Sequence, residues 1–284
     1  MSLSGSPVAA IPTLLWAGYV TAAKKAATRS NALVTGTFVV GMGIIPILLY
    51  AAFSHVSLTG YELLLSIGSG LFFFVGSILY YKAIETEQIA NASGPGLIQP
   101  LMILTFSTLF LHQGITIYQG IAGAVIIFGV LMLITVKGAK LNRKLLPVIV
   151  ANILWSMYWI IASEAIIDSG NAPMPLLFSR ITSFAALMIT YVFFKSKFSK
   201  FESRGLGKHA LLPASISGFF DGSASALFGF MILTGLIAQA SIFFVALPIM
   251  ITVLGYIVYK ERLNKVQSIG MAVAIVGAFA LAIV

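Results

Sequence analysis

The sequence contains no cysteine and has few charged residues. Of its 284 residues, 9% are charged and 59% are hydrophobic, whereas an ordinary soluble domain carries about 25% charged residues. A soluble chain of this length has no core large enough to bury so much apolar surface, but a lipid bilayer can accept it. The composition therefore predicts an integral membrane protein.

The same scarcity excludes several kinds of site. Without cysteine there is no disulfide framework, no thiolate metal ligand and no cysteine nucleophile. His55, His112 and His209 each stand alone near the end of a predicted helix, which argues against a histidine metal site. The sequence also lacks a phosphate-binding loop, a zinc-protease motif and a nucleophile elbow. We therefore predict no metal, no cofactor and no enzymatic activity.

Apolar runs fill most of the chain. A hydrocarbon core of about 30 Å needs about 20 residues of helix, and runs of that length alternate with short polar connections. Ten spans are predicted, at 7–26, 32–53, 62–82, 88–111, 117–136, 145–165, 173–194, 209–232, 236–258 and 266–284. The fold class is therefore all-α integral membrane with ten transmembrane helices and no soluble domain.

The two halves of the chain repeat each other. Ile89-Ala90-Asn91-Ala92-Ser93 matches Ile237-Ala238-Gln239-Ala240-Ser241, and Pro100 matches Pro248 at the same spacing of 148. Further pairs are Met102 with Met250, Gln119 with Gln267, Gly129 with Gly277, and Leu15-Trp16-x-x-Tyr19 with Leu154-Trp155-x-x-Tyr158, the last at a spacing of 139. Five helices per half is an odd number, so the halves must enter the membrane in opposite directions. We predict two inverted five-helix repeats, 1–140 and 141–284, an architecture found in many secondary transporters.

A second pattern points to a family. Residues 247–277 contain a proline, an apolar helix, a Glu-Arg-Leu turn, a glutamine and a glycine-rich helix, carried by Leu247-Pro248, Glu261-Arg262-Leu263, Gln267, Gly270 and Gly277. The first half keeps Pro100, Gln119 and Gly129 but has His112-Gln113-Gly114 in place of the Glu-Arg turn. With this pattern the chain resembles the drug/metabolite transporter superfamily, in its ten-helix group with two EamA-type repeats. The resemblance implies import or export of amino acids, drugs, sugars or nucleotide conjugates without naming the substrate.

Asp221 is the most conspicuous polar residue within a span. It lies near the middle of the eighth span, with no other acid or base within ten residues. A mid-helix Asp costs about 2.5–3.5 kcal/mol on insertion scales, so it should face protein or water. It could be a protonatable coupling group, a counter-charge for a cationic substrate, or a structural cap at a helix break at Gly222. For Arg180, the one basic residue away from the loops, snorkelling to the membrane surface is favoured over pairing with Asp221 or Glu164.

Aromatic and amide side chains complete the predicted site. Trp and Tyr at one-turn spacing share a helix face, and two such faces meeting across the halves would make an aromatic cavity for apolar or cationic groups. The alternative is the aromatic belt at the membrane surface. Intramembrane amides could bind a polar metabolite or form interhelical hydrogen bonds worth about 0.6 kcal/mol. The predicted substrate-binding residues are Trp16, Tyr19, Asn91, Gln99, Asn152, Trp155, Tyr158, Asp221 and Gln239.

The positive charges lie in the loops. If the loops are numbered in chain order, every one of the 17 lysines and arginines except Arg180 falls in an odd-numbered loop. The positive-inside rule then places these loops in the cytoplasm and both termini outside, whereas the family resemblance implies cytoplasmic termini. Membrane orientation also accounts for the net charge of +9 without a nucleic-acid partner.

These observations favour one function over two alternatives. The leading hypothesis is a multi-pass secondary transporter of the cell membrane that moves a small organic molecule, such as an amino acid or a drug-like amphiphile, by alternating access. Its partners would be the substrate, the lipid bilayer and a coupling proton or cation, and it would work as a monomer or homodimer. The alternatives are an intramembrane enzyme and a structural membrane protein without transport activity.

Overall fold

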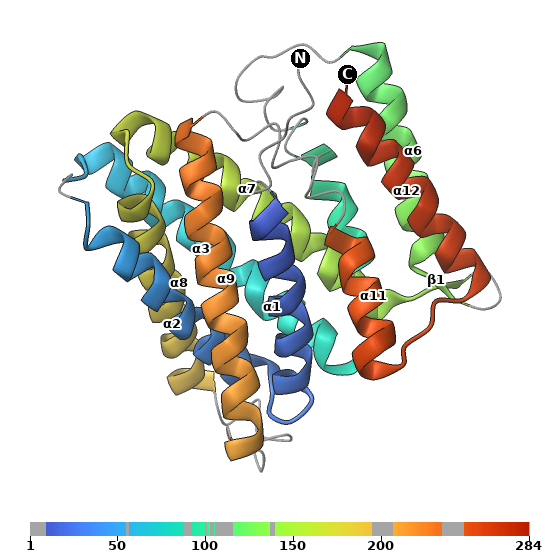
Figure 1. Ribbon diagram of the computed structural model, residues 1–284, viewed down its shortest axis with the longest axis horizontal. Helices are drawn as coiled ribbons and strands as arrows, with labels where there is room; N and C mark the ends of the chain where they lie inside the picture. The colour runs from blue at the N-terminus through green and yellow to red at the C-terminus, as the bar shows by residue number, and fades with distance from the viewer. Residues whose placement is uncertain are drawn as a thin grey trace.

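The computed structural model describes residues 10–54, 57–87, 92–99, 101–102, 105, 116–136, 140–194, 207–234 and 247–283. Within these residues the chain is helical apart from one pair of short strands (Figure 1). The α-helices are α1 (Ile11–Ala27), α2 (Ala32–Ala51), α3 (Gly60–Thr86), α6 (Ile117–Leu133), α7 (Leu146–Ser169), α8 (Pro173–Phe194), α9 (Lys208–Thr234), α11 (Leu247–Tyr259) and α12 (Lys265–Ile283). Two 3-10 helices, η2 (Gly94–Ile98) and η3 (Arg143–Leu145), complete the helical part.

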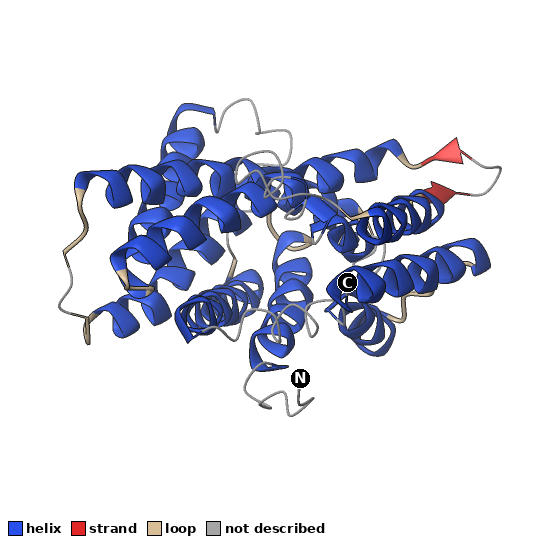
Figure 2. Ribbon diagram, turned by 90° about the horizontal axis from the view of Figure 1, so that it is seen from above, coloured by secondary structure: helices blue, strands red, loops and turns tan. Residues whose placement is uncertain are grey.

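The strands form a hairpin between α6 and α7. β1 (Thr135–Val136) pairs antiparallel with β2 (Lys140–Leu141), and Figure 2 shows the pair at one end of the molecule. The hairpin lies in the fifth loop, where the sequence predicted a connection between the two halves.

Five of the described helices have the length and composition of membrane spans. α2, α3, α7, α8 and α9 are each long and apolar enough to cross a bilayer, and α6, α11 and α12 are shorter apolar helices. Large apolar side chains such as Leu49, Phe128 and Val276 are exposed on the outer surface, which suits lipid rather than water. The predicted fourth span, 88–111, lies largely outside the described residues, so the count of ten spans stays a prediction.

An asparagine caps the first turn of two helices at equivalent places in the halves. Asn31 precedes α2, and its side-chain oxygen accepts a hydrogen bond from the backbone N–H of Val34 at 2.8 Å. Asn171 precedes α8 and accepts from the N–H of Met174 at 3.0 Å in the same way. Each cap satisfies a backbone donor that the first turn of a helix leaves free. The matching caps place α2 and α8 in the same register, with Asn31 equivalent to Asn171.

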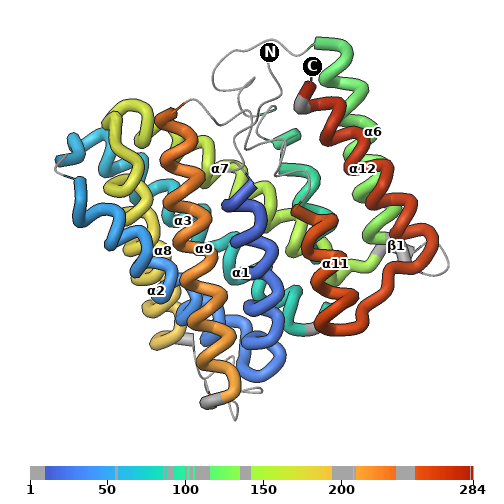
Figure 3. Tube along the Cα trace, in the orientation of Figure 1, coloured from blue at the N-terminus to red at the C-terminus, as the bar shows by residue number. Residues whose placement is uncertain are grey.

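Repeat-related helices also occupy equivalent places in the packing. α3 begins at Gly60 and α9 at Lys208, which is the spacing of Pro100 and Pro248, and the starts of α6 and α12 have the same spacing. α1 packs against α9 as α7 packs against α3, and α2 packs against α9 as α8 packs against α3. α6 and α12 pack against each other and run in opposite directions (Figures 1 and 3). This is the packing expected of two inverted repeats.

Glycines at two equivalent crossings bring the backbones of helices from different halves into contact. At Gly70 of α3 a Cβ would collide with the carbonyl oxygen of Ser179 in α8, and at Gly218 of α9 a Cβ would collide with that of Val39 in α2. Val39 and Ser179 are separated along the chain by the same spacing as the two Asn caps. Small residues permit this approach of helix backbones in membranes, and the two crossings fix how α8 and α9 face the interior.

Candidate substrate site

A cavity of about 80 Å³ lies between helices of the two halves. A single water needs roughly 10–15 Å³ measured in this way, so the space could hold several waters or a small ligand. Its lining is mostly aromatic and aliphatic, with amides and one ion pair. The residues are Trp16, Tyr19, Val20, Phe73, Tyr80, Ala92, Ser93, Gly96, Leu97, Gln99, Asn152, Trp155, Trp159, Arg180, Asp221, Ser225, Leu247, Pro248 and Ile251.

All three tryptophans of the chain line this cavity. Trp16 comes from α1, and Trp155 and Trp159 come from α7. The sequence predicted Trp16 and Trp155 but missed Trp159. Since residues four apart share a helix face, the position of Trp155 was sufficient to indicate Trp159.

The surroundings of Trp16 and Trp155 are related by the repeat. Trp155 lies against Phe73, with ring centroids 6.1 Å apart, and against Tyr80 at 4.8 Å. Trp16 lies against Phe228 at 5.6 Å and donates a hydrogen bond from its indole N–H to Asp221 at 3.3 Å. Asp221 and Phe228 follow Phe73 and Tyr80 at the spacing of 148. The two tryptophans therefore contact repeat-related positions, and Asp221 stands where the first half has Phe73.

Asp221 forms a buried ion pair with Arg180. The Nη1 of Arg180 donates to a carboxylate oxygen of Asp221 at 2.5 Å, and its Nη2 donates to the Ser225 hydroxyl at 2.7 Å. The guanidinium carbon also lies 3.9 Å from the ring centroid of Phe73. Both charged side chains are almost fully buried, with 1% and 5% of their surface exposed. The snorkelling predicted for Arg180 is wrong, because α8 turns this side chain towards α9 and the interior.

Two of the predicted amides meet. Gln99 donates from its side-chain nitrogen to the Asn152 oxygen at 3.0 Å, and Asn152 donates to the carbonyl of Val148 at 2.8 Å. Both amides line the cavity while bonding to each other. Asn91 and Gln239 lie outside the described residues.

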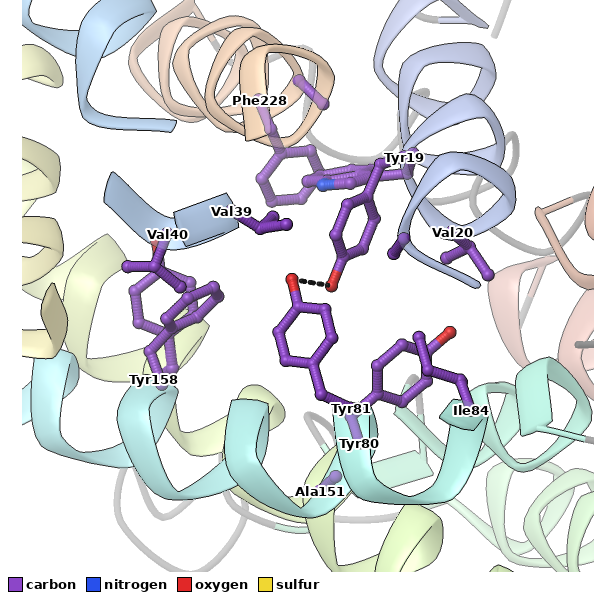
Figure 4. Close-up of a cluster of buried hydrophobic side chains, with 14 of the residues drawn as sticks. Tyr19, Val20, Val39, Val40, Tyr80, Tyr81, Ile84, Ala151, Tyr158 and Phe228 are labelled. Atoms are coloured by element: carbon purple, nitrogen blue, oxygen red, sulfur yellow. Dashed lines mark hydrogen bonds between the residues drawn. The ribbon is translucent and has the colours of Figure 1, made fainter. Parts of the chain in front are cut away.

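The two predicted tyrosines have different surroundings. Tyr19 lines the cavity, and its hydroxyl lies 3.2 Å from the hydroxyl of Tyr81 on α3 (Figure 4). Tyr158 is fully buried between Phe73 and Trp159, with ring centroids 5.0 and 4.8 Å away. Tyr158 thus supports the rings of the wall and does not face the cavity.

Hydrogen bonds join the odd-numbered loops on one face of the molecule. Lys24 donates from Nζ to the backbone carbonyl of Glu87, which links the first loop to the third. The Glu87 carboxylate accepts from Asn142 at 2.9 Å and lies 3.7 Å from the Lys144 ammonium, which adds the fifth loop. Further bonds run from Arg29 to the carbonyl of His209 at 2.9 Å and from the Tyr259 hydroxyl to the carbonyl of Thr21 at 2.6 Å. The described ends of the odd-numbered loops thus lie on one face, in agreement with the alternation of basic and uncharged loops in the sequence.

Possible metal ligands are not gathered anywhere in the described part of the chain. No three His, Asp or Glu side chains there lie close enough together to hold a metal ion. The chemistry of the cavity therefore comes from its aromatic rings, its amides and its ion pair.

These features define a membrane protein whose two repeats enclose a cavity. The chain belongs to the EamA-like transporter family, whose model matches residues 3–135 and again 143–283. It is thus a multi-pass membrane protein of the drug/metabolite transporter superfamily, and the resemblance drawn from the sequence is confirmed. The boundary at residue 140 stays a prediction.

The fold recurs in a solved structure. A chain titled "Crystal structure of protein" shares 15% identity with this one and a TM-score of 0.68, covering 98% of this chain and 96% of its own length. At that identity the likeness shows the fold alone. No curated protein matches the sequence.

Proposed function

We propose that the protein is a secondary transporter that carries a small organic molecule across the cell membrane by alternating access. The observation that carries this proposal is the cavity, which both halves line with aromatic rings and in which a buried ion pair lies. Sites of this kind lie between inverted repeats near the bilayer midplane in many secondary transporters. A structural membrane protein would have no need of this cavity, and the one carboxylate in the described lining, Asp221, is held in an ion pair with Arg180 instead of activating a nucleophile.

Alternating access requires the contacts between the halves to change. The bonds from Lys24, Asn142 and Lys144 to Glu87 tie the odd-loop face together, so this face has to open for a ligand to pass through it. We expect the two halves to rock about the cavity while each half keeps its internal packing. The described lining comes from a single chain, so a monomer is sufficient for the proposed site.

Coupling to an ion gradient would act through Asp221. Its two carboxylate oxygens accept hydrogen bonds from Trp16 and Arg180, so the charged form is well satisfied. Asp221 can therefore take up a proton or a cation only when Arg180 moves away. This makes the ion pair, and not an isolated Asp221, the unit that would couple transport to a gradient.

A flux measurement tests the proposal. The purified protein in liposomes should accumulate one or more compounds from an isotope-labelled metabolite extract, beyond what protein-free liposomes accumulate, when a pH gradient is imposed. The Trp16→Ala and Trp155→Ala variants should each weaken binding of a transported compound by the order of 1 kcal/mol or more, as expected for a buried aromatic contact. Absence of flux for every compound and gradient would refute secondary transport. Conversion of a compound without its movement would favour the enzyme.

A further inference from the structure

The ion pair has no counterpart in the other half of the cavity. At the spacing that relates Asn31 to Asn171, Arg180 corresponds to Val40. Asp221 corresponds to Phe73 at the spacing of 148. The backbone contacts of the equivalent glycines in α3 and α9 confirm these registers. One half therefore supplies Val40 and Phe73 where the other supplies a cation and an anion, so the described lining carries charged side chains from one half only.

Arg180 has hydrogen-bonding capacity in reserve. A guanidinium has five N–H donors, and in Arg180 one nitrogen binds Asp221 and another binds Ser225. Its Nε is buried and makes no hydrogen bond of good geometry to the described residues, and the Tyr158 hydroxyl is the polar group that lies near the guanidinium there. Phe73 covers the guanidinium at 3.9 Å and limits how it can turn. A planar, fixed guanidinium of this kind matches the geometry of a carboxylate.

The charges around the cavity disfavour a cationic ligand. Asp221 already accepts bonds from Arg180 and Trp16, and a ligand cation would have to approach it beside the positive Arg180. A ligand carboxylate is repelled by Asp221 in the same way until Asp221 leaves Arg180, but Asp221 can then be neutralised by a proton, whereas the Arg180 guanidinium cannot lose its charge. The displaced Asp221 side chain would take up one proton from the bulk solution, so the ligand's negative charge would be offset and the net charge of the buried site would not change.

We propose that the cavity binds an organic monocarboxylate with an apolar or aromatic body, and that its carboxylate replaces Asp221 at Arg180. This inference rests on the proposed function and names the substrate class. The rings of Trp16, Trp155 and Trp159 would contact the ligand's body. Because only one side of the cavity carries charge, the ligand would bind in one orientation. Each anion would be accompanied by one proton.

Tryptophan fluorescence provides a direct binding assay, since all three tryptophans line the cavity. Four probes of similar shape separate the ligand classes: phenylacetate, its neutral amide phenylacetamide, the cation phenethylamine and the zwitterion phenylalanine. We expect phenylacetate to bind most tightly, with phenylacetamide weaker by about tenfold or more because it lacks the charge-assisted bond. Binding of phenylacetate should also take up a proton, measurable as a pH rise in a weakly buffered solution.

Variants of the ion pair distinguish ligand exchange from a purely structural role. Asp221→Asn removes the competing carboxylate, so it should tighten phenylacetate binding several-fold and abolish the proton uptake. Arg180→Gln should remove the preference for the acid over the amide. If the pair only held the helices together, both variants would weaken all probes alike. The double variant Arg180→Gln/Asp221→Asn avoids an unpaired buried charge and should bind the acid and the amide equally. Tyr118→Phe changes an exposed side chain on α6 that does not line the cavity, so this control should behave as the parent.

Several results would overturn the inference. One is tighter binding of the amide, the amine or phenylalanine than of phenylacetate. Another is weaker binding of phenylacetate by Asp221→Asn than by the parent. The third is that the parent binds none of the four probes. Failure of the inference can be told from failure of the proposed function by the flux measurement with labelled extract. If that flux persists while the acid has no advantage, the protein is a transporter of another substrate class.

Discussion

The buried ion pair allows a quantitative prediction about stability. Removing one partner of a buried pair typically costs about 3–5 kcal/mol because the other charge stays unpaired. Asp221→Asn leaves the Arg180 guanidinium, which cannot lose its proton, whereas Arg180→Gln leaves a carboxylate that can take up a proton and become neutral. We therefore expect Asp221→Asn to cost about 4 kcal/mol or more and Arg180→Gln to cost less, about 2–3 kcal/mol. The double variant, with two amides able to bond to each other, should lie within about 1 kcal/mol of the parent.

These values give a double-mutant cycle with a matched control. The coupling energy for the buried pair should reach several kcal/mol. Lys144 and Glu87 lie 3.7 Å apart and the Lys144 side chain is 72% exposed, so this control pair should couple by no more than about 1 kcal/mol. The assay is unfolding of the purified protein in detergent, followed by tryptophan fluorescence. If the two single substitutions add in the double variant, Arg180 and Asp221 do not stabilise each other. In that case the reasoning about the site is refuted.

Two further predictions concern helix packing and orientation. A Cβ at Gly270 would lie 2.7 Å from the Gly129 carbonyl oxygen, so Gly270→Ala should force α6 and α12 apart at a cost of about 1–3 kcal/mol. Gly120 has open space around it, so Gly120→Ala should leave the melting temperature unchanged or slightly raised. Equal melting temperatures of the two variants would contradict the packing. The chain has no cysteine of its own, so single cysteines report the orientation. An impermeant thiol reagent should label Ser57→Cys in the second loop of intact cells, but should label Thr28→Cys in the first loop only after permeabilisation. The opposite pattern would show cytoplasmic termini.

Much of the architecture could be predicted from patterns along the sequence. Hydrophobic runs of bilayer length locate the helices, and the spacing that relates Pro100 to Pro248 also relates the starts of α3 and α9. The basic residues alternate between loops, which predicts that odd-numbered loops share one face. The hydrogen bond from Arg29 to the carbonyl of His209 lies on such a face. These signals are local or periodic along the chain, so they can be read without knowing which helices contact each other.

The direction in which the Arg180 side chain points could not be predicted from the sequence. Its depth in the predicted span is compatible with snorkelling, and nothing near it in the sequence pairs with it. Its rotation towards Asp221 depends on how α8 crosses α3 at Gly70 and how α9 crosses α2 at Gly218. Phe73 was missed for the same reason, because an aromatic residue in an apolar helix has no distinctive pattern until the repeat register pairs it with Asp221.

The interleaved packing of the two halves has a consequence for how the protein is made. α6 has its main partner in α12, which begins only at Lys265, and at synthesis rates of about 5–20 residues per second this partner emerges about 7–30 s afterwards. α1 likewise waits for α9, and α3 waits for α7. The faces of these early helices that later contact the second half must therefore do without those partners until it arrives. Arg180 on α8 has to wait less for its partner, because Asp221 lies on α9, the next α-helix along the chain. Insertion of α8 and α9 together would avoid placing an unpaired charge in the membrane.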